Sequence, residues 1–262
     1  MRDVAILGMH RSGTSALAGC LHLIGLHLGP PEHLFPPAPE NPKGFWENSY
    51  LSWLNDRVMM AMDGGTWREP PKIKGDWQQE EWAAGEIEKA HTLISEMRAR
   101  GPRRPVGFKD PRSCITLPFW RHVFGERLAA VFIWRPFQEV WQSLRKRDPS
   151  HFTEGRAAEL WLRYNGDALK NLAGLPVYCL SYQQLLDYPE HHLWRIRTFL
   201  SNHQVAGLYE PPGPELHSFL NHGLCHWNDD GVKSALSWSI VAGMAKNLRT
   251  LPAESDCFEE IT

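Results

Sequence analysis

The chain has 262 residues, of which 42% are hydrophobic, and it carries 28 Lys and Arg against 30 Asp and Glu, giving a formal net charge of −2. This length allows one large domain with a sizeable core, and we predict a single domain over residues 1–262. The near balance of charge gives the whole molecule no electrostatic attraction to nucleic acid or anionic lipid, so any anion site has to be local.

The five cysteines are scattered along the chain, and no two of them form a C-x-x-C pair. This pattern argues against a disulfide framework and against a zinc site, so we expect no metal. No apolar run approaches the roughly 18 to 20 residues that a helix needs to cross a bilayer. We therefore predict a cytoplasmic protein with no stable membrane insertion and no nucleic-acid partner.

Four short apolar runs predict strands, and the segments between them predict helices. The strands are expected at residues 3–8, 105–109, 129–134 and 176–180, and the helices at residues 15–27, 47–62, 77–100, 116–125, 137–147 and 183–201. Strands that alternate with helices predict a three-layer α/β/α fold with a mainly parallel central sheet. Residues 30–75, which begin with a proline-rich stretch, are expected to form lid and acceptor loops, and the acidic tail at 252–262 is expected to fray.

The first predicted strand leads into GMHRSGTSAL, where Gly8 and Gly13 have the spacing of a phosphate-binding loop, G-x-x-x-x-G-K-[ST]. The N–H groups of such a turn converge at a helix N-terminus, where the helix dipole favours an anion. Thr14 occupies the lysine position, and a cation stands earlier, at Arg11. Nucleoside triphosphate enzymes use that lysine to reach the β and γ phosphates, so this loop favours a 5′-phosphate or a phosphosulfate. An ordinary strand-to-helix turn is the alternative, but the dipole would then repel Arg11.

The loop resembles the 5′-phosphosulfate loop of the sulfotransferases that use 3′-phosphoadenosine 5′-phosphosulfate (PAPS), in the R-S-G-T form of tyrosylprotein, carbohydrate and many bacterial members. A second stretch, IWRPFQEVWQSL at residues 133–144, resembles the 3′-phosphate motif of that family. In this motif an arginine closes a strand and a serine follows eight residues later, here Arg135 and Ser143. An arginine fork and a helix hydroxyl suit a phosphate, although Arg135 alone is also typical of a surface ion pair. The cations at 145–147 follow this motif and raise the local positive potential.

Two further stretches are similar to this family, and together the four stretches cover roughly residues 4 to 200 in the expected order. VGFKDPR at residues 106–112 resembles the strand whose terminal lysine, here Lys109, meets the sulfonate and the bridging oxygen. CLSYQQLL at residues 179–186 resembles the segment near the adenosine, with glutamines in place of two acidic residues. Tyr182 in this segment is therefore either a ligand or a packing residue.

The resemblance implies a P-loop nucleotide-hydrolase-like fold and a sulfotransferase that needs no metal. Such an enzyme moves a sulfuryl group from PAPS to a hydroxyl or amine of a small-molecule, glycan or peptide acceptor and releases adenosine 3′,5′-bisphosphate. The implied cofactor-binding residues are His10, Arg11, Ser12, Gly13, Thr14, Ser15, Arg135, Ser143 and Tyr182. Arg11 and Lys109 are the implied catalytic cations.

An acceptor hydroxyl also needs a general base. ENPKGFWEN, at residues 40–48, resembles a stretch of bacterial relatives, and tyrosylprotein sulfotransferases take their base from a glutamate in the corresponding region. Glu47 is the first candidate, and Glu40, Asp110 and His10 are the alternatives. The other interpretation of Glu47 is a carboxylate that only stabilises a helix start.

Two other functions stay open. A P-loop kinase of small molecules would share the fold and the loop, but the missing lysine and the pairing of Arg135 with Ser143 count against it. A nucleotide-binding module without catalysis would keep the fold alone.

Overall fold

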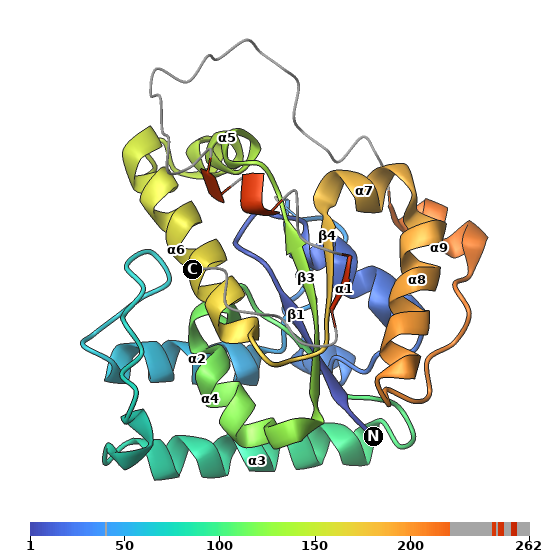
Figure 1. Ribbon diagram of the computed structural model, residues 1–262, viewed down its shortest axis with the longest axis horizontal. Coiled ribbons are helices and arrows are strands. Elements are labelled where there is room, and N and C mark those ends of the chain that lie inside the picture. The colour runs from blue at the N-terminus through green and yellow to red at the C-terminus, as the bar shows by residue number, and fades with distance from the viewer. Residues whose placement is uncertain (40, 221–242, 245, 249–252, 256–262) are drawn as a thin grey trace.

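The computed structural model describes residues 1–39, 41–220, 243–244, 246–248 and 253–255. Its centre is a sheet with the strand order β2-β1-β3-β4-β5. The parallel strands are β1 (Asp3–Leu7), β2 (Gly107–Lys109), β3 (Leu128–Trp134) and β4 (Val177–Ser181), and β5 (Glu254–Ser255) runs antiparallel to β4. Helices lie on both sides of the sheet (Figure 1), which confirms the predicted α/β fold with a mainly parallel sheet.

The helices divide between the two faces. Those that share one core are α2 (Ser49–Ala61), α3 (Ala83–Arg100), α4 (Ser113–Phe124), α5 (Phe137–Arg147) and α6 (Glu154–Leu172). Those that share the other core are α1 (Thr14–Leu23), α7 (Tyr182–Asp187), α8 (Pro189–Asn202) and α9 (Gly213–Phe219). None of the helices within the described ranges is long and apolar enough to span a membrane.

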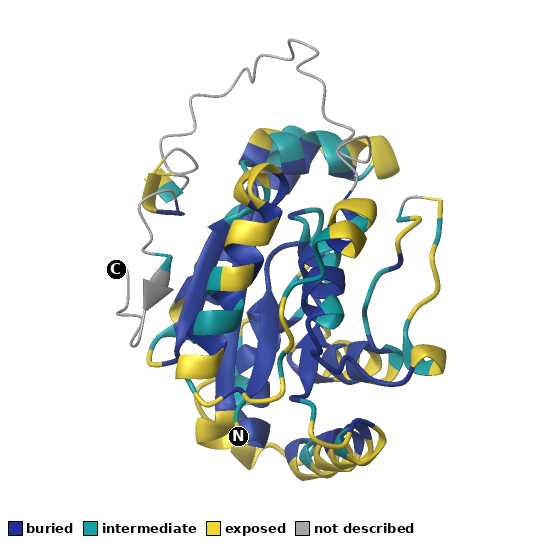
Figure 2. Ribbon diagram, turned by 90° about the vertical axis from the view of Figure 1, so that its right-hand side faces the viewer, coloured by how far each residue is buried: buried dark blue, intermediate teal, exposed yellow. Residues whose placement is uncertain are grey.

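The alternation of side chains along each strand explains why the chain builds two cores. In β1, Ala5 and Leu7 pack with the first group of helices, and Val4 and Ile6 pack with the second group. Every residue of β1 and β3 is buried, so the sheet forms the dark blue centre of Figure 2. Strands covered on both faces need continuous apolar sequence, which is the pattern that predicts them.

Several helix boundaries differ from the predictions. Helix α6 was not predicted, although its buried residues recur at helical spacing and the Thr153 side chain caps it by accepting from the Arg156 N–H. Helix α3 begins at Ala83, because residues 77–79 form a separate 3-10 turn. The helix predicted at 183–201 is two helices, and the second begins at Pro189, a residue suited to a first helical turn.

Part of the tail that was expected to fray forms structure. Residues 254–255 pair with β4, and the N–H of Cys179 donates to the carbonyl of Ala253 at 2.8 Å. The rest of the predicted frayed tail lies outside the described residues.

A buried polar cluster joins α2 to α4, the two helices that follow the segments carrying Glu47 and Lys109. Asn55 is completely buried, and its Nδ2 donates to Ser113 Oγ at 3.2 Å. Its Oδ1 accepts from Thr116 Oγ1 at 2.6 Å and from Trp120 Nε1 at 2.8 Å. One amide thus satisfies three polar groups of α4 and fixes the position of α2.

We expect Asn55→Ala to lower the free energy of unfolding by about 2–4 kcal/mol, because it leaves the buried Trp120 N–H and two hydroxyls without this partner. Chemical denaturation followed by circular dichroism measures the loss. Asn202→Ala, at the exposed end of α8, is the matched control and should change stability by less than about 0.5 kcal/mol. Equal stability of the two variants would contradict the role given to Asn55.

Candidate active site

A pocket of about 270 Å³ lies where the parallel strands end. Its walls include residues at or just after the ends of β1, β2, β3 and β4, the place where open α/β sheets bind ligands. Of the residues singled out in the sequence, those that line it are His10, Arg11, Gly13, Thr14, Ser15, Glu47, Lys109, Arg135 and Tyr182. Ser12 and Ser143 do not line it.

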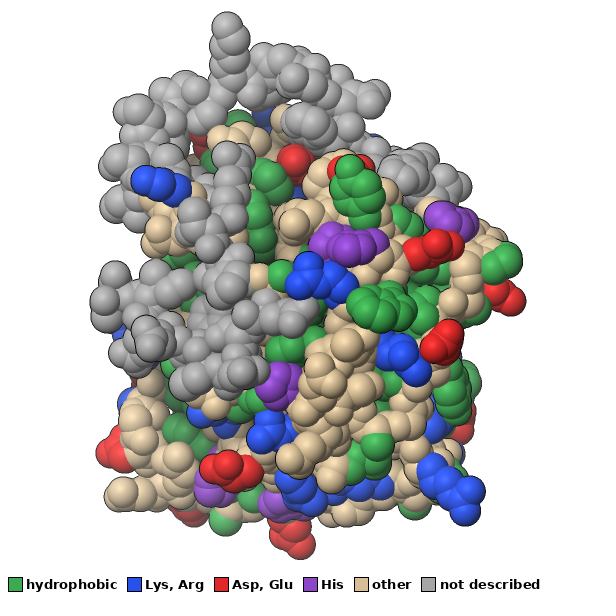
Figure 3. All heavy atoms as spheres, turned by 45° about the vertical axis from the view of Figure 1, so that its right-hand side comes forward, with side chains coloured by type: hydrophobic (Ala, Val, Ile, Leu, Met, Phe, Trp, Pro, Cys, Tyr) green, Lys and Arg blue, Asp and Glu red, His purple; other side chains and the backbone are tan. Residues whose placement is uncertain are grey.

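The pocket concentrates positive charge in a molecule whose formal net charge is only −2. Its lining cations are Arg11, Lys43, Lys109, Arg112, Arg135 and Arg147, against Glu47 as the one lining carboxylate among the described residues. On the face seen in Figure 3, by contrast, basic and acidic side chains are interspersed. The local excess is the kind of site that an anion requires. Within the described ranges no three His, Cys, Asp or Glu side chains gather in a way that could hold a metal ion.

The loop between β1 and α1 has the backbone of an anion cradle. Arg11 and Gly13 have positive φ angles of 66° and 89°. A Cβ at Gly13 would lie 2.1 Å from the Tyr182 ring, so only glycine fits there. Among the described residues no side chain caps the N-terminus of α1, which starts at Thr14. Its first N–H groups are therefore free of intrahelical partners and add to the positive potential of the loop.

The second arginine motif meets this loop through direct contacts. Arg11 Nε donates to Ser143 Oγ at 2.7 Å, which joins residues 132 positions apart. Arg135 Nη1 donates to the Arg11 carbonyl at 3.3 Å, and Arg135 Nε donates to Glu139 Oε2 at 2.7 Å. The Arg135 guanidinium lies 5.0 Å from the centroid of the Tyr182 ring. Arg11, Arg135, Ser143 and Tyr182 thus form one cluster, in which the Arg11 side chain points toward Ser143 on α5.

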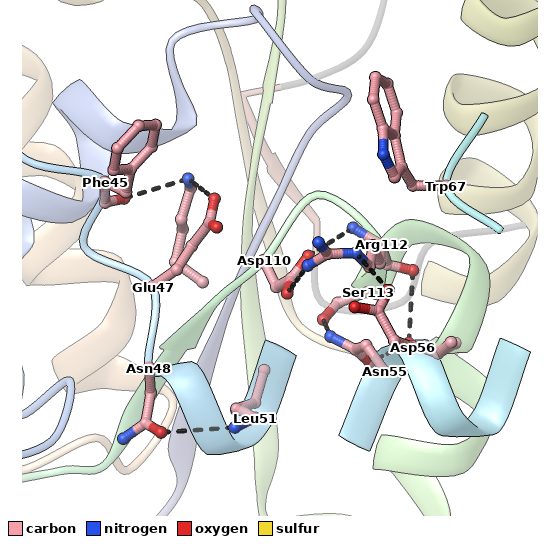
Figure 4. Close-up of polar contacts among 12 residues, drawn as sticks. Phe45, Glu47, Asn48, Leu51, Asn55, Asp56, Trp67, Asp110, Arg112 and Ser113 are labelled. Atoms are coloured by element: carbon pink, nitrogen blue, oxygen red, sulfur yellow. Dashed lines mark hydrogen bonds and ion pairs between the residues drawn. The ribbon is translucent and has the colours of Figure 1, made fainter. Parts of the chain in front are cut away.

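Lys109 holds the opposite side of the pocket together. Its side chain is 2% exposed, and its ammonium donates to Ser15 Oγ and to the Phe45 carbonyl, each at 3.1 Å. It also donates to Glu47 Oε1 at 2.5 Å (Figure 4). All three N–H donors of the ammonium are therefore used. One side chain connects β2, the start of α1 and the segment before α2.

Glu47 lies directly before α2, as the sequence predicts. Asn48 caps this helix, because its Oδ1 accepts from the N–H groups of Tyr50 at 3.1 Å and Leu51 at 3.4 Å. Burial raises the pKa of Glu47 above its ordinary value, although the neighbouring Lys109 acts in the opposite direction. A carboxylate with a raised pKa is better able to accept a proton near neutral pH.

The alternative bases are held in ways that suit proton acceptance less well. Asp110 is completely buried, and its two oxygens accept from the Arg112 N–H at 2.8 Å and from Arg112 Nη1 at 2.7 Å. Burial acts to raise the pKa of Asp110, but the Arg112 charge and the hydrogen bonds that Asp110 accepts hold that pKa below its usual value. Burial, with a further contribution from Arg112, lowers the pKa of His10 to about 3. Glu40 lies outside the described residues.

Some residues at the site were not identified from the sequence, and two that were identified, Ser12 and Ser143, do not line the pocket. Lys43 and Arg112 line the pocket, and each belongs to a stretch that resembles the family, which was the available signal. Ser12 is completely buried, and its Oγ has no hydrogen-bond partner within the described ranges. Its N–H donates to the Met9 carbonyl at 3.1 Å, so Ser12 holds the turn of the loop.

Comparison with known proteins gives a likeness at the level of structure. No family model matches the sequence, and no curated protein sequence matches it. The structure is similar to the "Sulfotransferase Domain from the Curacin Biosynthetic Pathway", with a TM-score of 0.58 and 16% identity over 96% of this chain and 99% of that chain. It is also similar to the "Sulfotransferase Domain from the Synechococcus PCC 7002 Olefin Synthase", with a TM-score of 0.57 and 16% identity over 95% of each chain. The chain has the fold of these sulfotransferase domains.

Proposed function

We propose that this chain is a sulfotransferase of the bacterial R-S-G-T type, which moves a sulfuryl group from PAPS to a hydroxyl or amine of its acceptor in the cytoplasm. The observation that carries the proposal is the hydrogen bond from Arg11 to Ser143, with Arg135 beside it, because Arg11 and Arg135 line the same pocket as Lys109. Two motifs that resemble the two phosphate-binding motifs of that family thus meet, in a chain with the fold of sulfotransferase domains.

The groups that line and adjoin the pocket fit such a donor. Arg11, Arg135 and Ser143 supply two guanidinium groups and a hydroxyl for the 3′-phosphate side, and Tyr182 packs beside them for the adenosine. Lys109 with Ser15, and the uncapped first turn of α1, supply an ammonium, a hydroxyl and backbone N–H groups for the phosphosulfate side. These are donors to oxyanions, and the scheme requires no metal.

The chemistry divides between Lys109 and Glu47. When bound, PAPS supplies a sulfuryl group that passes to the acceptor atom while the bond to the bridging phosphate oxygen breaks and that oxygen keeps the electron pair. Lys109 places a fixed positive charge where negative charge develops, in a buried setting where such a charge acts strongly. Glu47 accepts the proton that the acceptor hydroxyl or amine gives up. Lys109 and Glu47 are paired with each other in this structure, so each must separate from the other before it acts on the substrates.

A kinase is the alternative function, and the site argues against it. The lysine that reaches β and γ phosphates in P-loop enzymes is absent, and Thr14 stands in its place. The Arg11, Arg135 and Ser143 cluster instead offers cations to a phosphate away from the loop.

We expect adenosine 3′,5′-bisphosphate to bind at least about tenfold more tightly than ATP, because charged hydrogen bonds of about 1.5–3 kcal/mol hold its 3′-phosphate. Isothermal titration calorimetry measures both affinities. Arg135→Gln should weaken the bisphosphate about 10- to 100-fold and leave ATP nearly unchanged. Arg145→Gln, at an exposed position of α5, the helix that follows Arg135, is the control. A preference for ATP would favour the kinase.

We expect Lys109→Met to reduce turnover by about 10²- to 10³-fold while bisphosphate affinity falls less than about tenfold, because the ammonium acts on charge that develops during transfer. Release of bisphosphate and mass gain of the acceptor measure turnover across a broad acceptor panel. Lys89→Met, at an exposed position of α3, controls for loss of a lysine, and circular dichroism checks the fold. If the unmodified protein transfers no sulfuryl group to any acceptor of the panel, the result favours the nucleotide-binding module without catalysis.

We expect kcat/KM to fall as the pH falls through the raised pKa of Glu47, because protonation removes the base. Since this pKa lies above that of an ordinary glutamate, activity is lost at a higher pH than an exposed glutamate would give. Glu47→Gln should lower the rate about 10²- to 10⁴-fold and abolish the fall of kcat/KM at low pH. Glu32→Gln, at an exposed position in the 3-10 turn at Pro31–His33, should keep this loss of activity at low pH. If the fall of kcat/KM at low pH persists in Glu47→Gln and is absent in Glu40→Gln, the base is Glu40 and not Glu47.

A further inference from the structure

Trp46 lies between the two residues of the segment before α2 that bind the Lys109 ammonium, Phe45 and Glu47. Its φ angle is 58°, in the left-handed region of the backbone map. A bulky residue seldom adopts this region, because its Cβ comes too close to the following carbonyl oxygen. Such a backbone persists only where surrounding contacts impose it, and it is typical of functional sites.

The left-handed turn lets two neighbouring groups reach one ammonium. The Phe45 carbonyl accepts from Lys109 Nζ at 3.1 Å, and Glu47 Oε1 accepts from the same atom at 2.5 Å (Figure 4). In an extended segment the carbonyl lies in the plane of the strand and the side chain stands roughly perpendicular to it, so the two would point in different directions. The Glu47 carbonyl also accepts from the Phe35 N–H at 2.9 Å, which fixes the chain just after the turn. The bend at Trp46 therefore brings the carbonyl and the carboxylate together.

The Trp46 ring packs against α1 and α9. Phe45 and Glu47 line the pocket, whereas Trp46 is not a lining residue. The centroid of its ring lies 4.9 Å from that of His22 on α1 and 6.0 Å from that of Phe219 on α9, which meets it edge-on. The Trp46 Nε1 is buried and has no hydrogen-bond partner among the described residues. Among the contacts described, packing alone holds the ring.

The surface that receives this ring is itself closely fitted. Phe219 lies on α1 at Gly19, where an added Cβ would be 2.0 Å from the Phe219 ring. Three residues before Trp46, Lys43 Nζ donates to the Ser218 carbonyl at 3.2 Å. The segment before Trp46 and the ring of Trp46 thus both meet the C-terminal end of α9. These contacts fix the ring and, through it, the backbone angle at this position.

We propose, on the basis of the proposed function, that Trp46 is a positioning residue for the base: its ring, packed on α1 and α9, imposes the left-handed backbone that aims the Glu47 carboxylate at Lys109. Trp46 acts through Glu47, because it does not line the pocket. The alternative is that the ring only fills space against α1 and α9. The two roles differ in what they require of the backbone, because positioning requires a φ angle near 58° and packing alone does not.

The test compares Trp46→Gly with Trp46→Ala, which both remove the ring and differ by one methyl group. Glycine adopts positive φ about as readily as negative φ, whereas alanine carries the Cβ that crowds the carbonyl oxygen. We expect Trp46→Gly to have a kcat/KM about 5- to 30-fold higher than that of Trp46→Ala. The same pair of substitutions at Trp194, an exposed position on α8, should show no gain for glycine.

A second pair of variants, Trp46→Asn and Trp46→Leu, has side chains of the same shape. Asparagine tolerates the left-handed region, and leucine is better at filling apolar space. Positioning therefore predicts a higher kcat/KM for Trp46→Asn, and packing alone predicts a higher kcat/KM for Trp46→Leu.

Another measurement follows Glu47 itself and needs no turnover. NMR titration of the ¹³C-labelled carboxyl groups gives the pKa of Glu47, whose signal is identified by its absence from Glu47→Gln. Burial is the largest cause of the raised pKa of Glu47, while Lys109 and Arg112 oppose it and Asp110 adds to it. In Trp46→Ala the freed carboxylate gains water, so its pKa should fall toward that of an ordinary glutamate. In Trp46→Gly the pKa should stay at the value of the unmodified protein.

The outcomes separate this inference from the function on which it rests. Equal kcat/KM or equal Glu47 pKa values in Trp46→Gly and Trp46→Ala overturn the positioning role and leave sulfuryl transfer by the unmodified protein intact. If the unmodified protein binds no adenosine 3′,5′-bisphosphate and transfers nothing, the proposed function fails, and the Glu47 titration then decides whether Trp46 positions the carboxylate. Circular dichroism checks that each variant is folded, and the asparagine and leucine variants decide between the two roles if the alanine variant does not fold.

Discussion

The ammonium of Lys109 is the contact on which the site depends. A charge that is almost fully removed from water is tolerated only when its hydrogen bonds and its counter-charge are in place, and Ser15, Phe45 and Glu47 supply them. These partners come from three segments that are distant in sequence. The end of β2, the first turn of α1 and the approach to α2 are therefore held in one arrangement by an electrostatic requirement as well as by apolar packing.

This arrangement has a consequence for how a ligand enters. An anion that reaches Lys109 replaces one of its present acceptors, and the acceptor carrying full negative charge is Glu47. The Glu47 carboxylate would then lie beside the ligand without its ammonium partner. Burial would still disfavour its charged form. In the proposed function, donor binding and proton acceptance by Glu47 are thus linked through Lys109.

The sequence predicted the framework well because its signals were local. Strands β1, β3 and β4 are buried on both faces and read as continuous apolar runs, and the glycine-bounded loop after β1 has a spacing set by its own geometry. Helix α6 was missed although its periodicity was present, and β5 is too short to have any pattern. The three-layer fold followed from the alternation of strands and helices alone.

The site was predictable as a set of residues, and its internal arrangement was not. Resemblance brought Arg135, Lys109 and Glu47 forward, but the contact of Arg11 with Ser143 spans 132 positions and depends on tertiary packing. The raised pKa of Glu47 depends on burial that no short stretch encodes. Which of three successive basic residues on α5 faces the pocket depends on how the helix is rotated, and this is fixed by its packing.

The close contact between Tyr182 and Gly13 limits which residue can replace the glycine. The aromatic ring fills the space that a methyl group would need, so the two positions are sterically one unit although 169 residues separate them along the chain. A smaller residue at 182 would remove the collision and would leave the strain of a side chain at the positive φ of Gly13. Position 13 is therefore reserved for glycine twice, once by its neighbour across the pocket and once by its own backbone.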